Sequence, residues 1–324
     1  MCTAISYKSN SHYFGRNLDL EYSYDESVTI TPRNFPIKFR KERAFGKHYA
    51  MIGMAYIKNG IPLYYDATNE KGLSLAGLSF PGNAVYHGEK SDMYNVAVFE
   101  LIPWVLGQCR NVKEAKELVK KTNLIKLSFD EELQLTPLHF MLSDSDESIV
   151  LEPSDTGIKM ITNPVNVLTN NPPFVYQLHQ LNDYMGLSKK QPMNRFAREL
   201  PLEIYSRGMG ALGLPGDASS FSRFVRAAFV KWNSLAGKNE LENVNQFFHI
   251  LGAVEQQKGC VQLENGEYEY TIYSSCCNTA RGIYYYKSYD NSRIHAIDMN
   301  KEDLEGKDLI AFPMMTEVDI KWEN

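Results

Sequence analysis

The sequence contains no apolar run close to the length that a membrane-spanning helix needs, which is about 20 residues. Its first residues also lack the basic stretch followed by an apolar stretch that marks a secretory signal peptide. From these two absences we expect a cytoplasmic protein that forms no stable association with a membrane.

An excess of positive charge is missing as well. The chain has 34 Lys and Arg against 39 Asp and Glu, so its formal net charge is −5. Proteins that bind nucleic acid or anionic lipid surfaces through electrostatics need charge of the opposite sign. We therefore expect no nucleic-acid partner.

Metal-binding and phosphate-binding motifs are also absent. None of the five cysteines or seven histidines follows a metal-ligand spacing, and no glycine-rich phosphate loop occurs. An odd number of cysteines in a reducing compartment favours free thiols. We predict no metal and no cofactor. His139, His249 and His295 could in principle serve a Cys–His protease, but none lies in a papain-like context.

The composition, with 44% hydrophobic and 23% charged residues, is that of an ordinary globular protein. No shift in composition marks a linker, so we predict one domain over residues 2–324. Short strands alternate with helical regions, which favours an α+β fold with helices packed outside antiparallel sheets. The helical regions are expected at 94–106, 112–121, 174–184, from 222 onward and at 240–254, and residues 124–135 are expected to form a loop over the site. Trp232 and Leu241 are expected to face the core.

The chemistry is predicted at the beginning of the chain. Removal of Met1 would leave Cys2 with a thiol and a free α-amine on one residue. An α-amine titrates near about pH 8, so it can act as a base close to neutral pH. A thiolate is a strong nucleophile, and a nucleophile paired with an N-terminal amine is a known catalytic arrangement. Taken alone, a cysteine at the second position is more often an ordinary small residue.

The next residues raise the probability of a catalytic cysteine. Residues 3–7 and 13–17 read as strands joined by a turn, and such a hairpin would bring Arg16 and Asp19 back beside Cys2. A guanidinium near the thiol favours the thiolate, and a carboxylate can hold the α-ammonium or orient the arginine. The alternative is a surface Arg–Asp pair of little energetic value.

Motifs along the whole chain resemble those of the choloylglycine hydrolase family, which contains bile salt hydrolases and penicillin V acylases. They are Met1-Cys2-Thr3, Gly15-Arg16-Asn17-Leu18-Asp19, Asn69-Glu70-Lys71-Gly72-Leu73, Val167-Leu168-Thr169-Asn170-Asn171-Pro172, Gly213-Leu214-Pro215-Gly216-Asp217, Ser222-Arg223-Phe224 and Gly282-Ile283-Tyr284-Tyr285-Tyr286. The resemblance implies an N-terminal-nucleophile hydrolase with a four-layer αββα sandwich and a homotetrameric assembly. Within the family the chain looks most similar to bile salt hydrolases of Gram-positive gut bacteria.

The resemblance also implies the remaining site residues. Asn170 would bind the oxyanion through its side-chain amide, although Asn171 is as good a choice on spacing alone. Arg223 would support the thiolate or its hydrogen-bond network, and the backbone N–H of Ser79 would be the second oxyanion donor. Ser79 departs from the family, where bile salt hydrolases usually carry Asn and penicillin acylases Tyr. Serine at this position retains the backbone N–H, but the substrate specificity is left open.

The predicted activity is hydrolysis of the amide bond in glycine- or taurine-conjugated bile acids, with the choice between the two conjugates left open. The expected apolar pocket comprises Leu18, Leu20, Tyr22, Leu127, Phe129, Leu133 and Leu135. One alternative is a penicillin V acylase of the same family. Another is a non-catalytic bile-acid or lipid-binding protein on the same fold.

Overall fold

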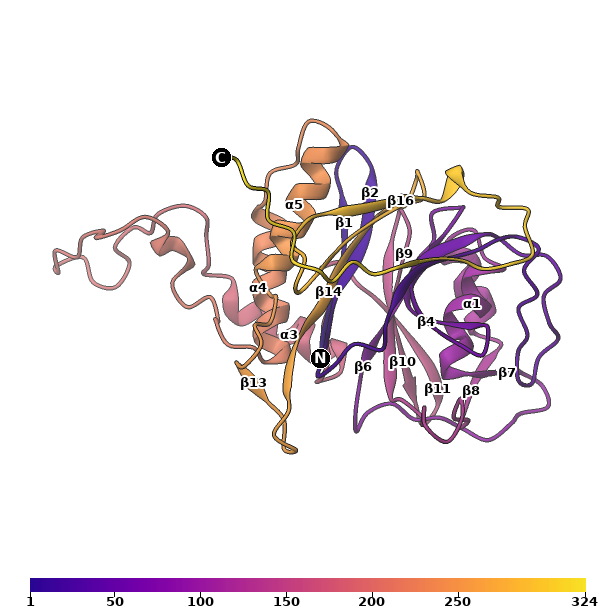
Figure 1. Cartoon of the computed structure of the whole chain (residues 1–324). Helices are drawn as coiled ribbons and strands as arrows, with labels where there is room; N and C mark the ends of the chain where they lie inside the picture. The colour runs from indigo at the N-terminus through magenta and orange to yellow at the C-terminus, as the bar shows by residue number, and fades with distance from the viewer.

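Two antiparallel sheets face each other in the computed structural model, which describes residues 1–324, and helices cover their outer faces (Figure 1). The predicted α+β class and the αββα layering are confirmed. The interface between the sheets is largely apolar, with Ala4, Met54, Ala76 and Met141 fully buried there.

The first sheet has the strand order β12-β1-β2-β14-β15-β16, and β13 pairs with one end of β14. Its strands are β1 (Cys2–Lys8), β2 (His12–Leu20), β12 (Val167–Leu168), β13 (Val261–Gln262), β14 (Tyr268–Asn278), β15 (Ile283–Ser288) and β16 (His295–Asp298). The strand that begins at Cys2 therefore lies inside the sheet, between β12 and β2.

The second sheet has the order β11-β10-β9-β6-β5-β4-β3-β17. Its strands are β3 (Ser27–Thr31), β4 (Met51–Lys58), β5 (Ile61–Asn69), β6 (Ser74–Ser79), β9 (Leu138–Ser143), β10 (Ser148–Ser154), β11 (Gly157–Thr162) and β17 (Ile310–Pro313). Two further strands, β7 (Tyr94–Ala97) and β8 (Thr122–Ile125), form a separate parallel pair.

The helices fall into two layers. On the first sheet lie α4 (Ser220–Asn233) and α5 (Glu240–Gly252), which contact β1 and β14, with α3 (Phe174–Gln180) and η2 (Leu181–Tyr184) after β12. On the second sheet lie α1 (Leu101–Leu106), which contacts β5 and β6, and α2 (Val112–Val119). Asn111 caps α2 by accepting the backbone N–H of Glu114, as its position before the helix predicts. None of the helices has the length and apolar character required to cross a membrane.

The prediction of a helix from residue 94 is wrong at its beginning. Residues 94–97 are β7, because they pair in register with β8 and that long-range pairing overrides the local helical spacing. The helical part begins with η1 (Val98–Glu100) and continues as α1. Pro103 lies in the first turn of α1, where a missing N–H costs no helical hydrogen bond. The expected loop over residues 124–135 starts with the last two residues of β8.

Trp232 and Leu241 do not face the core, contrary to prediction, since their exposed fractions are 62% and 74%. In α4 the inward positions belong to Ala227, Ala228 and Lys231, and Trp232 lies one position further round the helix. Its indole N–H instead donates to the Val165 carbonyl at 3.1 Å.

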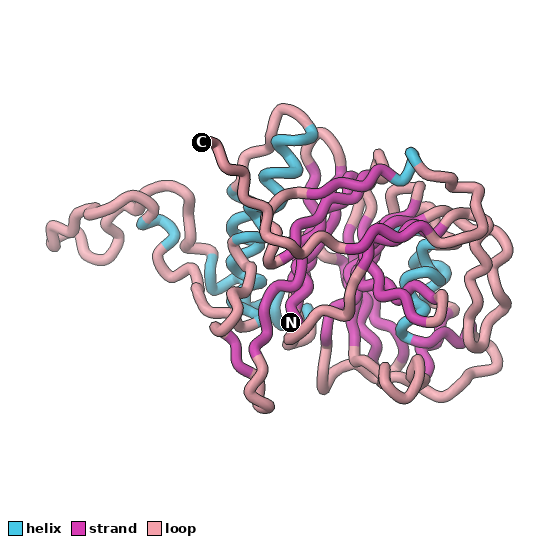
Figure 2. Tube along the Cα trace, viewed as in Figure 1, coloured by secondary structure: helices cyan, strands magenta, loops and turns pink.

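Residues 185–219 form a long arm that contains only one short helix, η3 (Met209–Ala211), and projects away from the sandwich (Figures 1 and 2). Large apolar side chains on this arm face solvent, among them Met185, Met193, Phe196 and Tyr205. The last short helix of the chain, η4 (Met299–Lys301), follows β16 on the body of the protein.

Candidate active site

The β1–β2 hairpin brings the predicted residues together at one end of the first sheet. In its antiparallel register Cys2 lies opposite Leu18 and Ala4 opposite Arg16. The backbone N–H of Asp19 donates to the Met1 carbonyl at 3.0 Å, so Asp19 lies beside the residue that precedes Cys2. The hairpin predicted from the sequence thus places both charged residues next to Cys2.

Cys2 is buried and is held by its backbone. Its backbone nitrogen donates to the Asn170 side-chain oxygen Oδ1 at 2.8 Å, and its carbonyl accepts from Arg223 Nη1 at 2.6 Å. Both contacts come from segments far along the chain, one after β12 and one on α4. They hold the nitrogen that would become the α-amine if Met1 were removed.

Arg223 joins these groups from the first turn of α4. Besides the Cys2 carbonyl, its guanidinium donates to Thr3 Oγ1 at 2.6 Å and to Asn170 Oδ1 at 2.8 Å. Its Nη1 lies 3.8 Å from Asp19 Oδ2. Burial lowers the pKa of Arg223, while Asp19 and Cys2 oppose that shift. Arg223 is therefore a buried cation, and the groups that offset the cost of burying its charge, Asp19 and Cys2, belong to the same site.

Asp19 is fully buried and accepts two side-chain hydrogen bonds, from Thr271 Oγ1 at 2.6 Å and from Gln256 Nε2 at 2.9 Å. Thr271 lies opposite Asp19 in the pairing of β14 with β2, and Gln256 follows α5. Neither residue was identified from the sequence. No local motif marks them, because their role depends on strand pairing across about 240 residues.

Arg16 is fully buried on the other side of Cys2 and its guanidinium contacts the second sheet. Nη1 donates to the Tyr65 carbonyl at 3.0 Å and also to the Gly77 carbonyl, while Nη2 has no partner. Burial acts to lower the pKa of Arg16, but Cys2 and the neighbouring acidic groups outweigh it and raise the pKa. The side chain remains a cation that faces the thiol, not a surface ion pair.

Asp66, which sequence reasoning missed, is a buried anion behind Arg16. It accepts hydrogen bonds from Tyr273 at 2.7 Å and Tyr284 at 2.8 Å, and it contributes to the raised pKa of Arg16. Burial raises the pKa of Asp66 itself, and Arg16 opposes that shift. Tyr284 belongs to one of the motifs that carry the family resemblance, which was the only signal available.

Asn170 and Ser79 lie together next to Cys2, whereas Asn171 does not. The side-chain amide of Asn170 donates to the Ser79 carbonyl at 2.8 Å, while that of Asn171 donates to the Pro81 carbonyl. The next residue, Phe80, donates its backbone N–H to the carbonyl of Pro137, just before β9, and so points toward that strand. Because backbone directions alternate along a strand, the N–H of Ser79 points away from β9, to the same side as its carbonyl.

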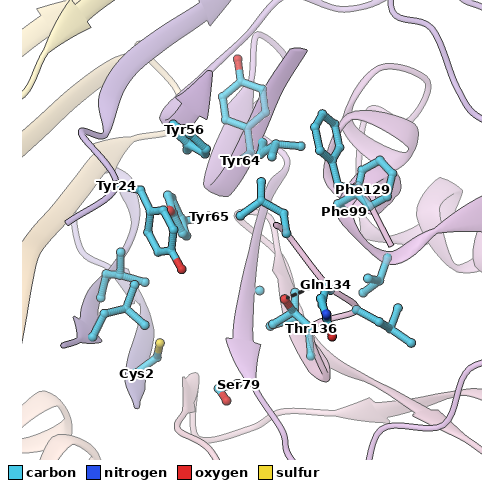
Figure 3. Close-up of a pocket in the computed structure, with 18 of the residues that line it drawn as sticks. Cys2, Tyr24, Tyr56, Tyr64, Tyr65, Ser79, Phe99, Phe129, Gln134 and Thr136 are labelled. Atoms are coloured by element: carbon cyan, nitrogen blue, oxygen red, sulfur yellow. Dashed lines mark hydrogen bonds between the residues drawn. The ribbon is translucent and has the colours of Figure 1, made fainter. Parts of the chain in front are cut away.

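A largely apolar cavity of about 270 Å³ opens beside Cys2 (Figure 3). Arg16, Gly77 and Ser79 line it with Cys2, and its other walls come from β2, β5 and the loop before β9. Of the predicted pocket residues, Leu18, Leu20, Leu127, Phe129, Leu133 and Leu135 line it. Aromatic residues that were not predicted complete the wall, namely Tyr24, Tyr56, Tyr64, Tyr65 and Phe99.

Tyr22 does not line the cavity, contrary to prediction. Its side chain is 46% exposed, and its hydroxyl contacts that of Tyr24 at 2.7 Å. The strand β2 ends at Leu20, so the alternation of side chains that would have turned Tyr22 inward stops there. Tyr24 takes its place.

Salt bridges and an aromatic contact are among the interactions that attach the loop between β8 and β9 to the body. Lys58 forms salt bridges with Asp130 and Glu132, both at 2.7 Å. The guanidinium of Arg40 lies 5.0 Å from the centre of the Phe129 ring, a cation–π geometry. The predicted loop over the site therefore has a defined position above the cavity.

No group of three or more His, Cys, Asp or Glu side chains is placed to hold a metal ion. His139 is fully buried, stacks on Phe80 with ring centres 4.2 Å apart, and shares a hydrogen bond with the Thr169 carbonyl at 2.8 Å. It is a core residue.

A cysteine at the start of an inner strand of an αββα sandwich, surrounded by Arg16, Asp19, Asn170 and Arg223, defines the architecture of an N-terminal-nucleophile hydrolase. A sequence profile described as "Linear amide C-N hydrolases, choloylglycine hydrolase family" matches residues 2–312. The chain belongs to this family and is an amidohydrolase that acts on linear C–N amide bonds.

Individual relatives agree with this assignment. The chain is 54% identical to a bile salt hydrolase/transferase of Lactiplantibacillus plantarum, with 98% of each chain covered. It is 36% identical to a bile salt hydrolase/transferase of Clostridium perfringens over 96% of both chains. A crystal structure of the C2A mutant of conjugated bile acid hydrolase from Clostridium perfringens has a TM-score of 0.93 at 35% identity, with 100% of both chains covered. A penicillin V acylase from Agrobacterium tumefaciens shares the fold, with a TM-score of 0.75, 20% identity and coverage of 95% and 90%.

Proposed function

We propose that the protein is a bile salt hydrolase that cleaves the amide bond of glycine- or taurine-conjugated bile acids, with Cys2 as nucleophile. The observation that carries the proposal is the position of Cys2 at the polar end of an otherwise apolar cavity. The cavity is close in size to ordinary small-molecule sites, which begin at about 300 Å³. The names of the relatives that share one third to one half of the sequence support this substrate class.

The reaction requires removal of Met1. The α-amine of Cys2 takes the thiol proton, and the thiolate attacks the amide carbon, so that a C–S bond forms and the carbonyl oxygen becomes an oxyanion. The α-ammonium then donates its proton to the amide nitrogen and the C–N bond breaks. Water, deprotonated by the same amine, attacks the thioester and releases the bile acid and the thiolate.

The oxyanion would be bound by the side-chain amide of Asn170 and the backbone N–H of Ser79. One N–H of that amide is used on the Ser79 carbonyl, which leaves the other for the oxyanion. The Ser79 N–H points to the same side of β6 as the Ser79 carbonyl, and Ser79 lines the cavity. Arg16 and Arg223 would favour the thiolate, and Asp19 would hold Arg223 and the α-ammonium in place.

The first experiment is an intact-mass measurement combined with detection of amine released from glycocholate and taurocholate. The expected result is loss of one methionine and release of glycine or taurine, which disappears in Cys2→Ser. Processed protein that releases no amine from bile salts but hydrolyses penicillin V would be a penicillin V acylase. Binding of bile acid without any release, unchanged in Cys2→Ser, would indicate a non-catalytic binding protein.

We further propose a homotetramer, because the arm of residues 185–219 exposes large apolar side chains that a monomer would leave in water. Light scattering after size-exclusion chromatography tests it, and a monomeric mass would contradict it. A cytoplasmic location is supported by five cysteines that form no disulfide. Cell fractionation tests that location.

A further inference from the structure

Met1 occupies a defined position beside β2. Its α-ammonium donates to the Asp19 carbonyl at 2.8 Å and forms an ion pair with the carboxylate of Glu269. Its own carbonyl accepts the Asp19 N–H. We call the space between Glu269 and the Asp19 backbone the ammonium slot. The Met1 ammonium in this slot shows how a primary ammonium group is bound there.

Glu269 has no part in the mechanism above, yet it is placed next to the catalytic groups. It lies near the start of β14, two residues before Thr271, which hydrogen-bonds Asp19, and only 6% of its surface is exposed. Burial raises the pKa of Glu269, while the Met1 ammonium opposes that shift. A buried carboxylate without a cation or a hydrogen-bond donor is costly. Removal of Met1 therefore takes away the ion-pair partner of Glu269 and leaves the Arg223 guanidinium, which also opposes that shift, and the new α-ammonium of Cys2 as the nearby cations.

Removal of Met1 would empty the slot next to the backbone nitrogen of Cys2. One residue of extended chain spans about 3.5 Å, so the slot lies about that far from the Cys2 nitrogen. That nitrogen gives its proton to the leaving amine. The released amine thus separates next to a carboxylate and a carbonyl that are already positioned for an ammonium group.

We propose that the ammonium slot binds the primary ammonium of the released amine, glycine or taurine, through Glu269 and the Asp19 carbonyl. This inference rests on the proposed function, since it concerns the second product of that reaction. The slot would favour products with an unsubstituted ammonium group, because a hydroxyl cannot form the ion pair and an added methyl group removes a donor.

The test is binding of taurine and glycine to protein that lacks Met1, measured by ligand-observed NMR titration. Isethionate and glycolate, which carry a hydroxyl in place of the ammonium, are the matched ligands. Glu269→Gln removes the charge at nearly constant shape, and Glu267→Gln removes the same charge from an exposed neighbour. Thermal melting verifies that each variant is folded. If Glu269→Gln does not fold, Glu269→Asp, which keeps the charge but shortens the side chain, is tested in its place.

We expect Glu269→Gln to weaken taurine binding about tenfold, the scale of one charge-assisted contact. Glu267→Gln should leave it unchanged, and the hydroxyl ligands should bind weakly to every variant. Protein that retains Met1 should not bind taurine, because its slot is filled. Equal affinity for taurine and isethionate, or for wild type and Glu269→Gln, would overturn the proposal. Since no substrate is turned over, this result is independent of whether bile salts are hydrolysed.

Discussion

Substitution of Asn170 separates its two functions, because its oxygen and its nitrogen contact different groups. Oδ1 accepts from the Cys2 nitrogen and from Arg223, both at 2.8 Å, and Nδ2 donates to the Ser79 carbonyl. Asn170→Ala removes all three contacts at a residue that is 4% exposed. Asn170→Asp keeps an oxygen at the acceptor position, replaces the donor by a second oxygen and adds a negative charge beside Arg223.

The two variants should therefore differ in stability and agree in activity. A hydrogen bond to a charged partner contributes about 1.5–3 kcal/mol, so Asn170→Ala should lower the free energy of unfolding by about 3–5 kcal/mol. Asn170→Asp should lower it by only about 1–3 kcal/mol, since it places a carboxylate oxygen against the Ser79 carbonyl. Both lose the amide donor, and loss of one oxyanion donor costs about 10²–10³ in kcat.

Urea unfolding of Met1-free protein and single-turnover release of taurine measure the two effects. Asn170→Asp should keep most of the stability and lose the rate of thioester formation. If Asn170→Asp retains kcat within about tenfold of wild type, the Asn170 amide is not an oxyanion donor. If Asn170→Ala is as stable as wild type, the buried contacts of Oδ1 contribute little to the free energy of unfolding.

Three further predictions concern packing and pH. Gly15→Ala should prevent folding, because its Cβ would lie 2.0 Å from the Ser275 carbonyl oxygen, whereas Gly46→Ala, with open space around it, should not change the melting temperature. Phe129→Ala should destabilise the protein by about 3–5 kcal/mol and raise KM for bile salts, since the ring is buried and lines the cavity. Burial lowers the pKa of Lys231 from 10.5 to about 8 in the folded protein. Between pH 8 and 10.5 the unfolded chain therefore binds more protons than the folded one, so the free energy of unfolding should rise with pH, by up to about 3 kcal/mol. Urea unfolding between pH 7 and 10 should show that rise in wild type and not in Lys231→Met.

Each of these has a contradicting result. A folded Gly15→Ala with wild-type stability would mean that β2 and β14 can separate at no cost. An unchanged KM in Phe129→Ala would mean that bile salt binds outside the cavity. Equal pH dependence in wild type and Lys231→Met would mean that the Lys231 amine keeps its ordinary pKa in the folded protein.

The residues of the site fall into two groups by how they could be found. Cys2, Arg16 and Asp19 lie within one hairpin, whose alternation and turn residues are readable locally, and Asn170 and Arg223 lie in motifs that resemble a family. The structure places these five together. Their catalytic roles stay predictions until the variants are measured, as does the single domain over residues 2–324.

The partners of these residues could not be predicted. Thr271, Gln256, Asp66 and Glu269 are ordinary polar residues in strands or after a helix, and no spacing distinguishes them. Their contacts arise from the pairing of β14 with β2 and from the packing of the two sheets. A one-residue shift in that pairing would turn every one of the strand side chains to the opposite face.

The amino-acid sequence by itself determined the order and type of most elements, because the alternation of a strand and the stripe of a helix are short-range properties. It also led to the prediction of Cys2 as nucleophile, since the chemistry expected of Cys2 depends on its own thiol and amine. Only the tertiary structure decided that residues 94–97 form a strand, that Tyr24 and not Tyr22 lines the cavity, and that a buried carboxylate at position 269 lies beside Met1. The reason is that these outcomes depend on pairing and burial between segments far apart in the chain, which no local pattern encodes.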